Sequence, residues 1–141
     1  MKASVAYLLA PVLGFMSAQV IKYILANRKD KNWRQFFRSG SMPSSHTAVV
    51  VSLATVILVH EGFSNLFSVA AVLTMITVYD ALVARRSIGE QGTALVRLIE
   101  KSPFAKDPLP RVALGHKPKE VIVGAALGIF LGIVVAIFIT A

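Results

Sequence analysis

The sequence contains no cysteine and few charged residues, which make up 16% of its 141 positions. Without cysteine the chain has no disulfide, no thiolate metal site and no thiol nucleophile. Acidic residues are scarcer still: seven Asp and Glu stand against fifteen Lys and Arg, so the formal net charge is +8. This excess would suggest nucleic-acid binding in a soluble protein, but 55% of the chain is hydrophobic. We therefore expect a single integral-membrane domain over residues 1–141 and no nucleic-acid partner.

Four apolar runs approach the roughly 20 residues that an α-helix needs to cross a bilayer. The second run is short, but only by a few residues. The first continues to Ala26, past a signal-peptide-like stretch that ends at Ala18, so we expect it to be retained as a span. The four expected spans are residues 5–26, 45–60, 66–83 and 121–141.

Positive charge alternates along these spans. Five Lys and Arg lie in the loop 27–44, none lies between residues 60 and 65, and eight lie in the loop 84–120. Because cytoplasmic loops are enriched in Lys and Arg, we expect both large loops in the cytoplasm and both termini outside. Losing two or three of these cations to substrate binding would not reverse the count. The sequence thus predicts an integral protein of the cell membrane whose site faces the cytoplasm.

The second cytoplasmic loop is long enough to have structure of its own. Between Gly89 and Lys101, the apolar residues Leu95, Leu98 and Ile99 alternate with polar ones, which is typical of a short amphipathic helix at the membrane interface. Three prolines between positions 103 and 110 then indicate an irregular stretch. The expected fold class is all-α: a polytopic membrane bundle of about four transmembrane helices plus this interfacial helix.

The second and fourth spans both begin beside a histidine. Free backbone N–H groups at a helix start favour an anion, and the expected topology puts both starts on the cytoplasmic side. Taken singly, Pro-Ser-Ser is a common helix start, a lone histidine is usually structural, and an arginine pair could anchor topology. Convergence on one side of the bundle favours a functional site. The converging residues are Lys22, Ser44, Ser45, His46, Arg85, Arg86 and His116.

The spacing of His116 and Glu120 suggests how such a site could act. They are four residues apart, so a helical turn would put them on one face. A carboxylate can fix the tautomer of a histidine and leave its other ring nitrogen free to attack, while His46 protonates the leaving group. Lys22, an arginine and helix-start amides would compensate phosphate charge. This set suits phosphoryl transfer without a metal ion or other cofactor.

These residues resemble the motifs of a membrane phosphatase superfamily, that of type-2 phosphatidic acid phosphatases and vanadium haloperoxidases. Pro43-Ser44-Ser45-His46 is similar to its Pro-Ser-Gly-His motif, and His116-x-x-x-Glu120 to its His followed four positions later by Asp. The small divergent branch of the superfamily is matched better and over nearly the whole chain. The segments that match this branch are Gln19-x-x-Lys22, Gly40-Ser41-Met42-Pro43-Ser44-Ser45-His46-Thr47-Ala48, Tyr79-Asp80, Arg85-Arg86, Gly89-Glu90-Gln91 and Leu114-Gly115-His116-x-Pro118-x-Glu120-Val121.

The resemblance implies a role for each catalytic residue. His116 is the nucleophile that forms a phosphohistidine, Glu120 orients it, and His46 gives a proton to the leaving alkoxide. The phosphate-binding residues that it implies are Lys22, Ser44 and Ser45.

The chain also departs from the superfamily pattern. The arginine just before His116 is Arg111, one position closer than the superfamily spacing, so we expect Arg86 to replace it, with Arg85 as a neighbouring candidate. Four further residues are additional candidates, and the last three have no counterpart in the ordinary motifs, which leaves open a cation, a different substrate or lost phosphatase activity. These candidates are Gln19, Asp80, Glu90 and Gln91.

The leading hypothesis is a metal-independent lipid-phosphate phosphatase of the cytoplasmic leaflet, with phosphatidylglycerophosphate or phosphatidic acid as substrate. The alternative is a non-catalytic membrane protein that binds anionic lipid in the ancestral phosphate pocket. A metal enzyme using His46, His116 and either Asp80 or Glu90 has less support, because no H-E-x-x-H or similar spacing is present. The expected partners are the bilayer and a lipid-phosphate substrate. The glycines of Gly124-x-x-x-Gly128-x-x-x-Gly132 could serve a homodimer or packing within the chain.

The orientation can be tested on a chain that lacks cysteine. Single cysteines introduced at Lys31, Asn65 and Lys106 should differ in their reaction with an impermeant thiol reagent added to intact cells. We expect labelling at position 65 alone, because the two basic loops lie inside. Labelling at 31 and 106 with protection at 65 would reverse the orientation and favour an outer-leaflet substrate.

Overall fold

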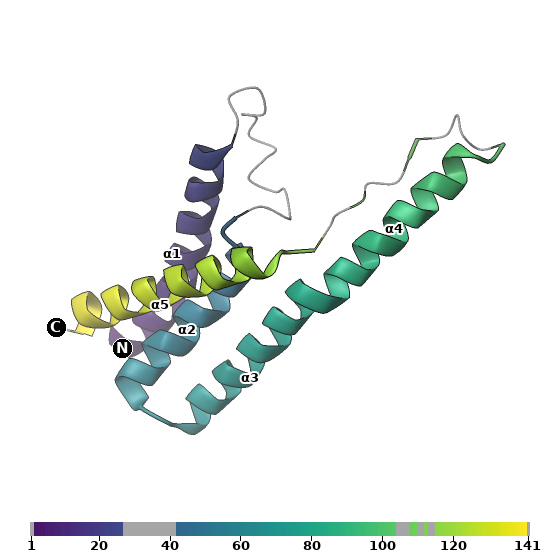
Figure 1. The fold of residues 1–141 in the computed structure, drawn as a ribbon. Helices are drawn as coiled ribbons and strands as arrows, with labels where there is room; N and C mark the ends of the chain where they lie inside the picture. Colours follow the sequence, from purple (N-terminus) through teal and green to yellow (C-terminus); the bar gives the residue numbers. More distant parts are fainter. Residues whose placement is uncertain (1, 27–41, 104–107, 110–111, 113–114, 141) are drawn as a thin grey trace.

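The described part of the chain is built from helices. The computed structural model describes residues 2–26, 42–103, 108–109, 112 and 115–140, and no β-strand occurs within them (Figure 1). The predicted all-α membrane bundle is confirmed. The elements are α1 (Lys2–Leu25), α2 (Ser45–Glu61), α3 (Asn65–Tyr79), a π-helical turn (Asp80–Ala84), α4 (Arg85–Glu100) and α5 (Pro118–Thr140).

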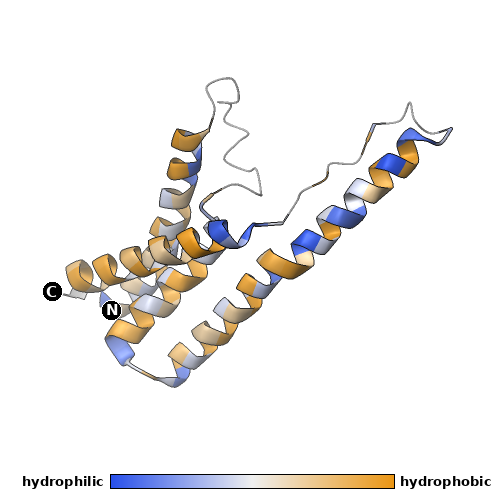
Figure 2. Cartoon of the chain, viewed as in Figure 1, coloured by the Kyte–Doolittle hydropathy of each residue, from blue (hydrophilic) through white to orange (hydrophobic). Residues whose placement is uncertain are grey.

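Most of these helices have the length and surface of membrane spans. Three stretches are long and apolar enough to cross a bilayer: α1, the continuous helix through α3 and α4, and α5. The helix α2 is apolar but has 17 residues. Large apolar side chains such as Leu8, Val69 and Phe138 are exposed, and Figure 2 shows mainly hydrophobic residues along α3 and α5, whereas hydrophilic and hydrophobic residues are mixed along α4. Such a surface suits lipid better than water.

Local sequence explains where α2 begins and ends. Ser44 is its N-cap, since the Ser44 Oγ accepts a hydrogen bond from the Thr47 N–H at 3.4 Å. At the other end, the Gly62 N–H donates to the Leu58 carbonyl at 3.0 Å, and Gly62 has a φ of 64°. Glycine adopts this left-handed conformation without the steric cost that other residues meet. The chain therefore turns sharply into α3, which has Ser64 as its N-cap.

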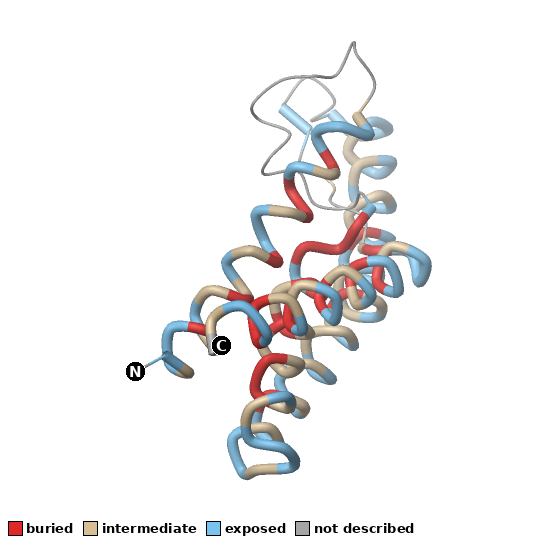
Figure 3. The backbone as a smooth tube through the Cα atoms, turned by 90° about the vertical axis from the view of Figure 1, so that its left-hand side faces the viewer, coloured by how far each residue is buried: buried red, intermediate tan, exposed pale blue. Residues whose placement is uncertain are grey.

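Small residues allow α1 and α5 to pack against α2 from two directions. A Cβ added to Gly14 of α1 would lie 2.9 Å from the Ala48 carbonyl oxygen, and one added to Gly128 of α5 would lie 2.8 Å from the same oxygen. At Gly132 an added Cβ would lie 2.6 Å from the Thr55 Cβ. The glycine face of α5 is thus occupied by α2 within one chain, so a homodimer would need a different surface. Figure 3 shows buried backbone concentrated where these three helices meet.

The third expected span and the expected interfacial helix form one continuous helix. This helix has 36 residues, from Asn65 to Glu100, and α4 projects beyond the bundle in line with α3 (Figure 1). Its length is about 54 Å, against about 30 Å for the bilayer core, so its far end must leave the hydrocarbon. The amphipathic segment therefore begins at Arg85 rather than Gly89, because no proline or capping residue interrupts the helix after the span.

A polar cluster lies at the end of the bundle where α2 turns into α3. The Tyr7 hydroxyl of α1 donates to the Glu61 Oε1 at 2.8 Å, and the Ser64 hydroxyl donates to the Glu61 Oε2 at 3.1 Å. The Tyr7 ring also lies 5.9 Å from the His60 ring, centroid to centroid. These contacts bring the start of α1 to the turn between α2 and α3, so both helix starts with functional candidates lie at the other end.

Packing through glycine predicts a selective effect of side-chain size on α5. Replacing Gly128 by Leu should lower the free energy of unfolding by about 1 to 3 kcal/mol or more, because the side chain would overlap the backbone of α2. Ala126 is exposed on the same helix, so Ala126→Leu is the matched control and should have little effect. Thermal unfolding of purified protein in detergent micelles measures both. Equal stability of the two variants would contradict this packing.

Candidate functional site

The starts of α2 and α5 are in direct backbone contact. The Ser44 N–H donates to the Glu120 carbonyl oxygen at 2.9 Å. A Cβ at Gly124, one turn after Glu120 in α5, would lie 2.5 Å from the Ser44 carbonyl oxygen, so only glycine fits there. The predicted meeting of these two helix starts is present in the structure. Their partial positive charges therefore act on the same small volume.

Lys22 brings a buried cation from the end of α1 into this volume. Its side chain is buried, and its Nζ donates to the Ser45 Oγ at 3.3 Å. Lys22 also interacts electrostatically with Glu120, the one carboxylate at the start of α5. Gln19 lies one turn earlier on α1 and is buried as well. A lysine buried in a membrane bundle is costly unless it meets negative charge, so this position favours an anion.

His116 and Glu120 form the closest polar pair of the site. The His116 Nδ1 lies 2.8 Å from the Glu120 Oε2, and the two side chains are only 3% and 14% exposed. The same carboxylate oxygen accepts the Lys117 N–H at 3.3 Å, as in a capping box, and Pro118 begins the helix. An ionised carboxylate can only accept at Nδ1, so in the neutral His116 ring this nitrogen carries the proton and Nε2 has the lone pair.

His46 reaches the same site from the first turn of α2. It interacts electrostatically with His116, Lys22, Arg85 and Asp80, which come from three other segments. Its side chain is exposed, in contrast to the buried His116. His46 therefore lies where the cluster meets the surface, and a substrate could reach it without displacing the bundle core.

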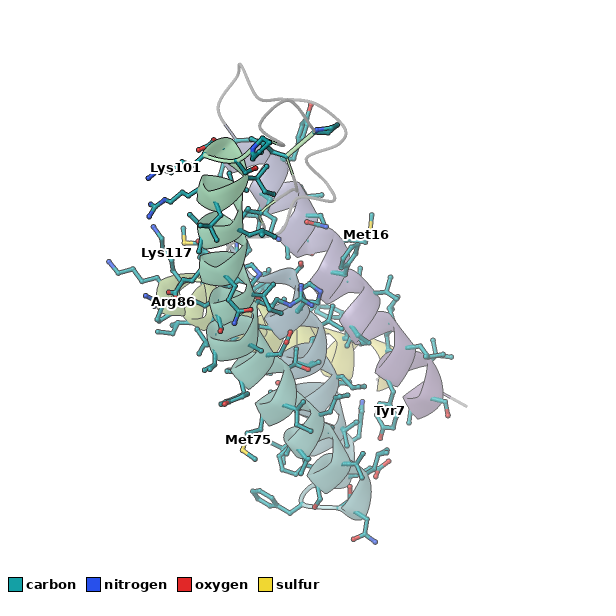
Figure 4. The ribbon with its side chains drawn as sticks, turned by 90° about the vertical axis from the view of Figure 1, so that its right-hand side faces the viewer. Tyr7, Met16, Met75, Arg86, Lys101 and Lys117 are labelled. Carbon is teal, nitrogen blue, oxygen red and sulfur yellow. The ribbon has the colours of Figure 1, made fainter. Side chains whose placement is uncertain are left out.

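The two arginines after the third span have different surroundings. The Arg85 Nε pairs with the Asp80 Oδ2 at 2.7 Å, with both side chains about half-buried, and Arg85 acts electrostatically on His46. The Arg86 Nε pairs with the Glu90 Oε1 at 3.1 Å, and these side chains are 67% and 65% exposed. Figure 4 shows Arg86 at the outer edge of the bundle, near Lys117. The structure thus favours Arg85 over Arg86 as the arginine of the site.

Several other candidates lie away from the histidines or outside the described part. Gln91 donates to the Ser87 Oγ at 3.2 Å on the exposed surface of α4. Within the described ranges, no three His, Asp or Glu side chains form a group that could hold a metal ion. The predicted residues outside the described residues are Gly40, Ser41, Arg111 and Leu114.

Sequence reasoning missed the π-helical turn, which holds the segment before α5 in place. The His116 N–H donates to the Ala81 carbonyl oxygen within this turn at 3.1 Å. A Cβ on Gly115 would lie 2.5 Å from the Arg86 backbone nitrogen, so the chain passes the helix at backbone contact distance. Gly115 in front of His116 was the signal that a close approach occurs, but its partner could not be read from the sequence.

The assembled groups suit an anion that carries several oxygens. Lys22, Arg85 and the N-termini of two helices supply positive charge, and the Ser45 hydroxyl can donate a hydrogen bond. The His116 ring, whose Nε2 could act as a nucleophile, interacts electrostatically with the His46 imidazole. Such a site can bind a phosphate group and transfer it.

Comparison with known proteins agrees with this interpretation at the level of the family. No solved structure matches the chain. The "Uncharacterized membrane protein YuiD" of Bacillus subtilis (strain 168) is 38% identical over 151 residues, which cover 93% of this chain and 94% of the relative. Together with the apolar helices, this likeness supports an integral membrane location. The profile of the Divergent PAP2 family matches residues 3–131, so the resemblance is confirmed and the chain belongs to that family.

Proposed function

We propose that this protein is a metal-independent lipid-phosphate phosphatase that acts at the cytoplasmic leaflet through a phosphohistidine. The observation that carries the proposal is the His116–Glu120 pair, in which the carboxylate occupies Nδ1 and leaves Nε2 as nucleophile. The pair lies beside the buried Lys22 and within electrostatic range of His46. A purely structural histidine would need neither a buried lysine nor a second imidazole nearby.

In the first step, the His116 Nε2 attacks phosphorus. A P–N bond forms, the P–O bond to the lipid breaks, and protonated His46 gives its proton to the leaving alkoxide. Glu120 stabilises the positive charge that develops on the His116 ring. In the second step, the oxygen of a water molecule attacks phosphorus while His46 takes a proton from that water. The P–N bond then breaks and releases inorganic phosphate.

Groups from α1 and α2 compensate the charge of the phosphate. Lys22 and Ser45 are already hydrogen-bonded to each other and can turn their donors toward a phosphate oxygen. Ser44 is engaged otherwise: its N–H donates to Glu120, and its Oγ accepts from the Thr47 hydroxyl at 3.0 Å. We therefore assign Ser44 to capping and to joining the two helix starts, and Ser45 to phosphate.

The choice of substrate follows from the topology expected from the sequence. A site at the cytoplasmic ends of α2 and α5 meets phosphate groups of inner-leaflet lipids. Phosphatidylglycerophosphate and phosphatidic acid both present a terminal phosphate monoester there, and their acyl chains can lie against the exposed apolar surface of the helices. Phosphatidylglycerophosphate is the first substrate to assay.

The test is phosphate release from a panel of lipid phosphates by purified protein and by its His116→Gln variant. Glutamine keeps the polar shape but cannot form the phosphoenzyme, so we expect release to fall by about a hundredfold or more. If the wild-type protein binds the lipids as tightly as the variant but releases no phosphate, it is a non-catalytic protein that binds anionic lipid.

The two histidines should fail in different ways. His116→Ala should abolish the phosphoenzyme for every substrate. His46→Ala should mainly slow departure of a poor alkoxide, and a substrate with a good leaving group, such as a nitrophenyl phosphate, should recover much of the rate. Phosphoenzyme trapping and the two rates measure this difference. Equal recovery in both variants would contradict the assigned roles, and thermal unfolding of each variant controls for lost helix capping.

The arginine pair supplies a further test. Arginine can present two parallel donors to phosphate, which lysine reproduces poorly. We expect Arg85→Lys to lower turnover or lipid affinity by about tenfold, a loss of roughly 1.4 kcal/mol, because Arg85 adjoins His46. Arg86→Lys makes the same chemical change one residue further along an exposed surface and should have the smaller effect. A larger loss in Arg86→Lys would restore the arginine first expected from the sequence.

A further inference from the structure

We infer that Asp80 is a positioning residue, which holds the Arg85 guanidinium in the orientation that binds phosphate. The inference rests on the proposed phosphate site and deepens it. No hydrogen bond or ion pair joins the Asp80 side chain to His46 or His116 in the described part of the chain. Among the described residues, its one side-chain hydrogen bond is the 2.7 Å bond from the Arg85 Nε to the Asp80 Oδ2.

The π-helical turn makes this pairing possible. In an α-helix, residues five apart point about 140° away from each other around the axis, so their side chains do not meet. Between Asp80 and Arg85 the helix widens, and the Arg85 N–H donates to the Asp80 carbonyl five residues back. This wider turn brings the two side chains onto nearly one face. The ion pair and the π-turn therefore occur together.

The π-turn is also fixed relative to the proposed nucleophile. The Ala81 carbonyl within it accepts the His116 N–H at 3.1 Å. A Cβ on Gly115 would lie 3.0 Å from the Arg85 carbonyl carbon, so the backbone before His116 rests on the backbone at Arg85. The base of the Arg85 side chain thus has a defined position relative to His116. Its long side chain still needs a contact that selects one rotamer.

Asp80 provides that contact at the inner nitrogen of the guanidinium. With Nε bound, the plane of the group is set and the two outer nitrogens remain as donors. Asp80 and Arg85 are 46% and 43% exposed, so simple charge attraction between them contributes little to stability. The main consequence of this ion pair is therefore that it orients the Arg85 side chain toward His46. Its contribution to the stability of the fold is small.

Charge and orientation predict opposite effects on phosphate binding when Asp80 is replaced by Asn. If Asp80 acted only through its negative charge, its removal would make the site more positive and phosphate would bind more tightly. If Asp80 orients Arg85, the neutral amide oxygen of Asn holds the Arg85 Nε less firmly than the carboxylate does, and phosphate binds more weakly. The sign of the change therefore separates the two roles.

The experiment measures binding of inorganic phosphate to the full chain in detergent micelles by titration calorimetry. We expect Asp80→Asn to weaken binding about tenfold and Arg85→Lys to weaken it similarly. The double variant should match Arg85→Lys alone, because lysine has no Nε for Asp80 to hold. Glu100→Gln is the matched control: it removes one exposed negative charge from the same continuous helix and should leave binding unchanged.

Unchanged or tighter binding in Asp80→Asn, or additive losses in the double variant, would overturn the inference, as would a wild-type chain that binds no phosphate. Should Asp80→Asn unfold, Asp80→Glu keeps the charge but moves the carboxylate, and it must also weaken binding. Phosphate binding needs no turnover. Asp80-dependent binding without phosphate release from lipids would keep this inference and reject the phosphatase.

Discussion

The site depends on the backbone contact between the starts of α2 and α5. The Ser44 N–H bonds to the Glu120 carbonyl, and this approach requires that position 124 have no side chain. Two helix N-termini held together would repel each other in a medium of low dielectric constant. The Glu120 carboxylate at the start of α5 offsets part of that repulsion, and it also lies 2.8 Å from the His116 Nδ1. One carboxylate thus acts on the charge of a helix start and on the orientation of the His116 ring.

A balance of charge follows from this arrangement. Lys22 is buried and interacts with Glu120, and Arg85 is partly neutralised by Asp80, so the side chains of the site include two cations and two carboxylates. The helix ends add further positive potential. A phosphate would therefore enter a site that is close to neutral in side-chain charge but lined with oriented donors. Donors that are already oriented can stabilise the charge that develops on a phosphate during a reaction, because they do not have to rearrange at that moment.

Much of this site could be predicted from local sequence, because its elements are set by short-range rules. The spacing of His116 and Glu120 predicted their contact, and a serine before an apolar run predicted the start of α2. The choice between Arg85 and Arg86 could not be predicted, since neighbouring helical residues point about 100° apart and a π-turn shifts the register. The Ala81 carbonyl of that turn accepts the His116 N–H, a contact between distant segments that no local pattern encodes.

The shortness of α2 has a consequence for where a lipid would react. Its 17 residues rise about 26 Å, which is less than the roughly 30 Å of the hydrocarbon core. Because α1 and α5 enclose this helix, its length need not match the surrounding lipid. If the charged Glu61 stays at the far boundary of the hydrocarbon core, the start of α2 would lie slightly below the near boundary. A phospholipid could thus bring its headgroup to His46 by sinking a few ångströms, with its acyl chains still in the leaflet, and no step of extraction into water would be needed.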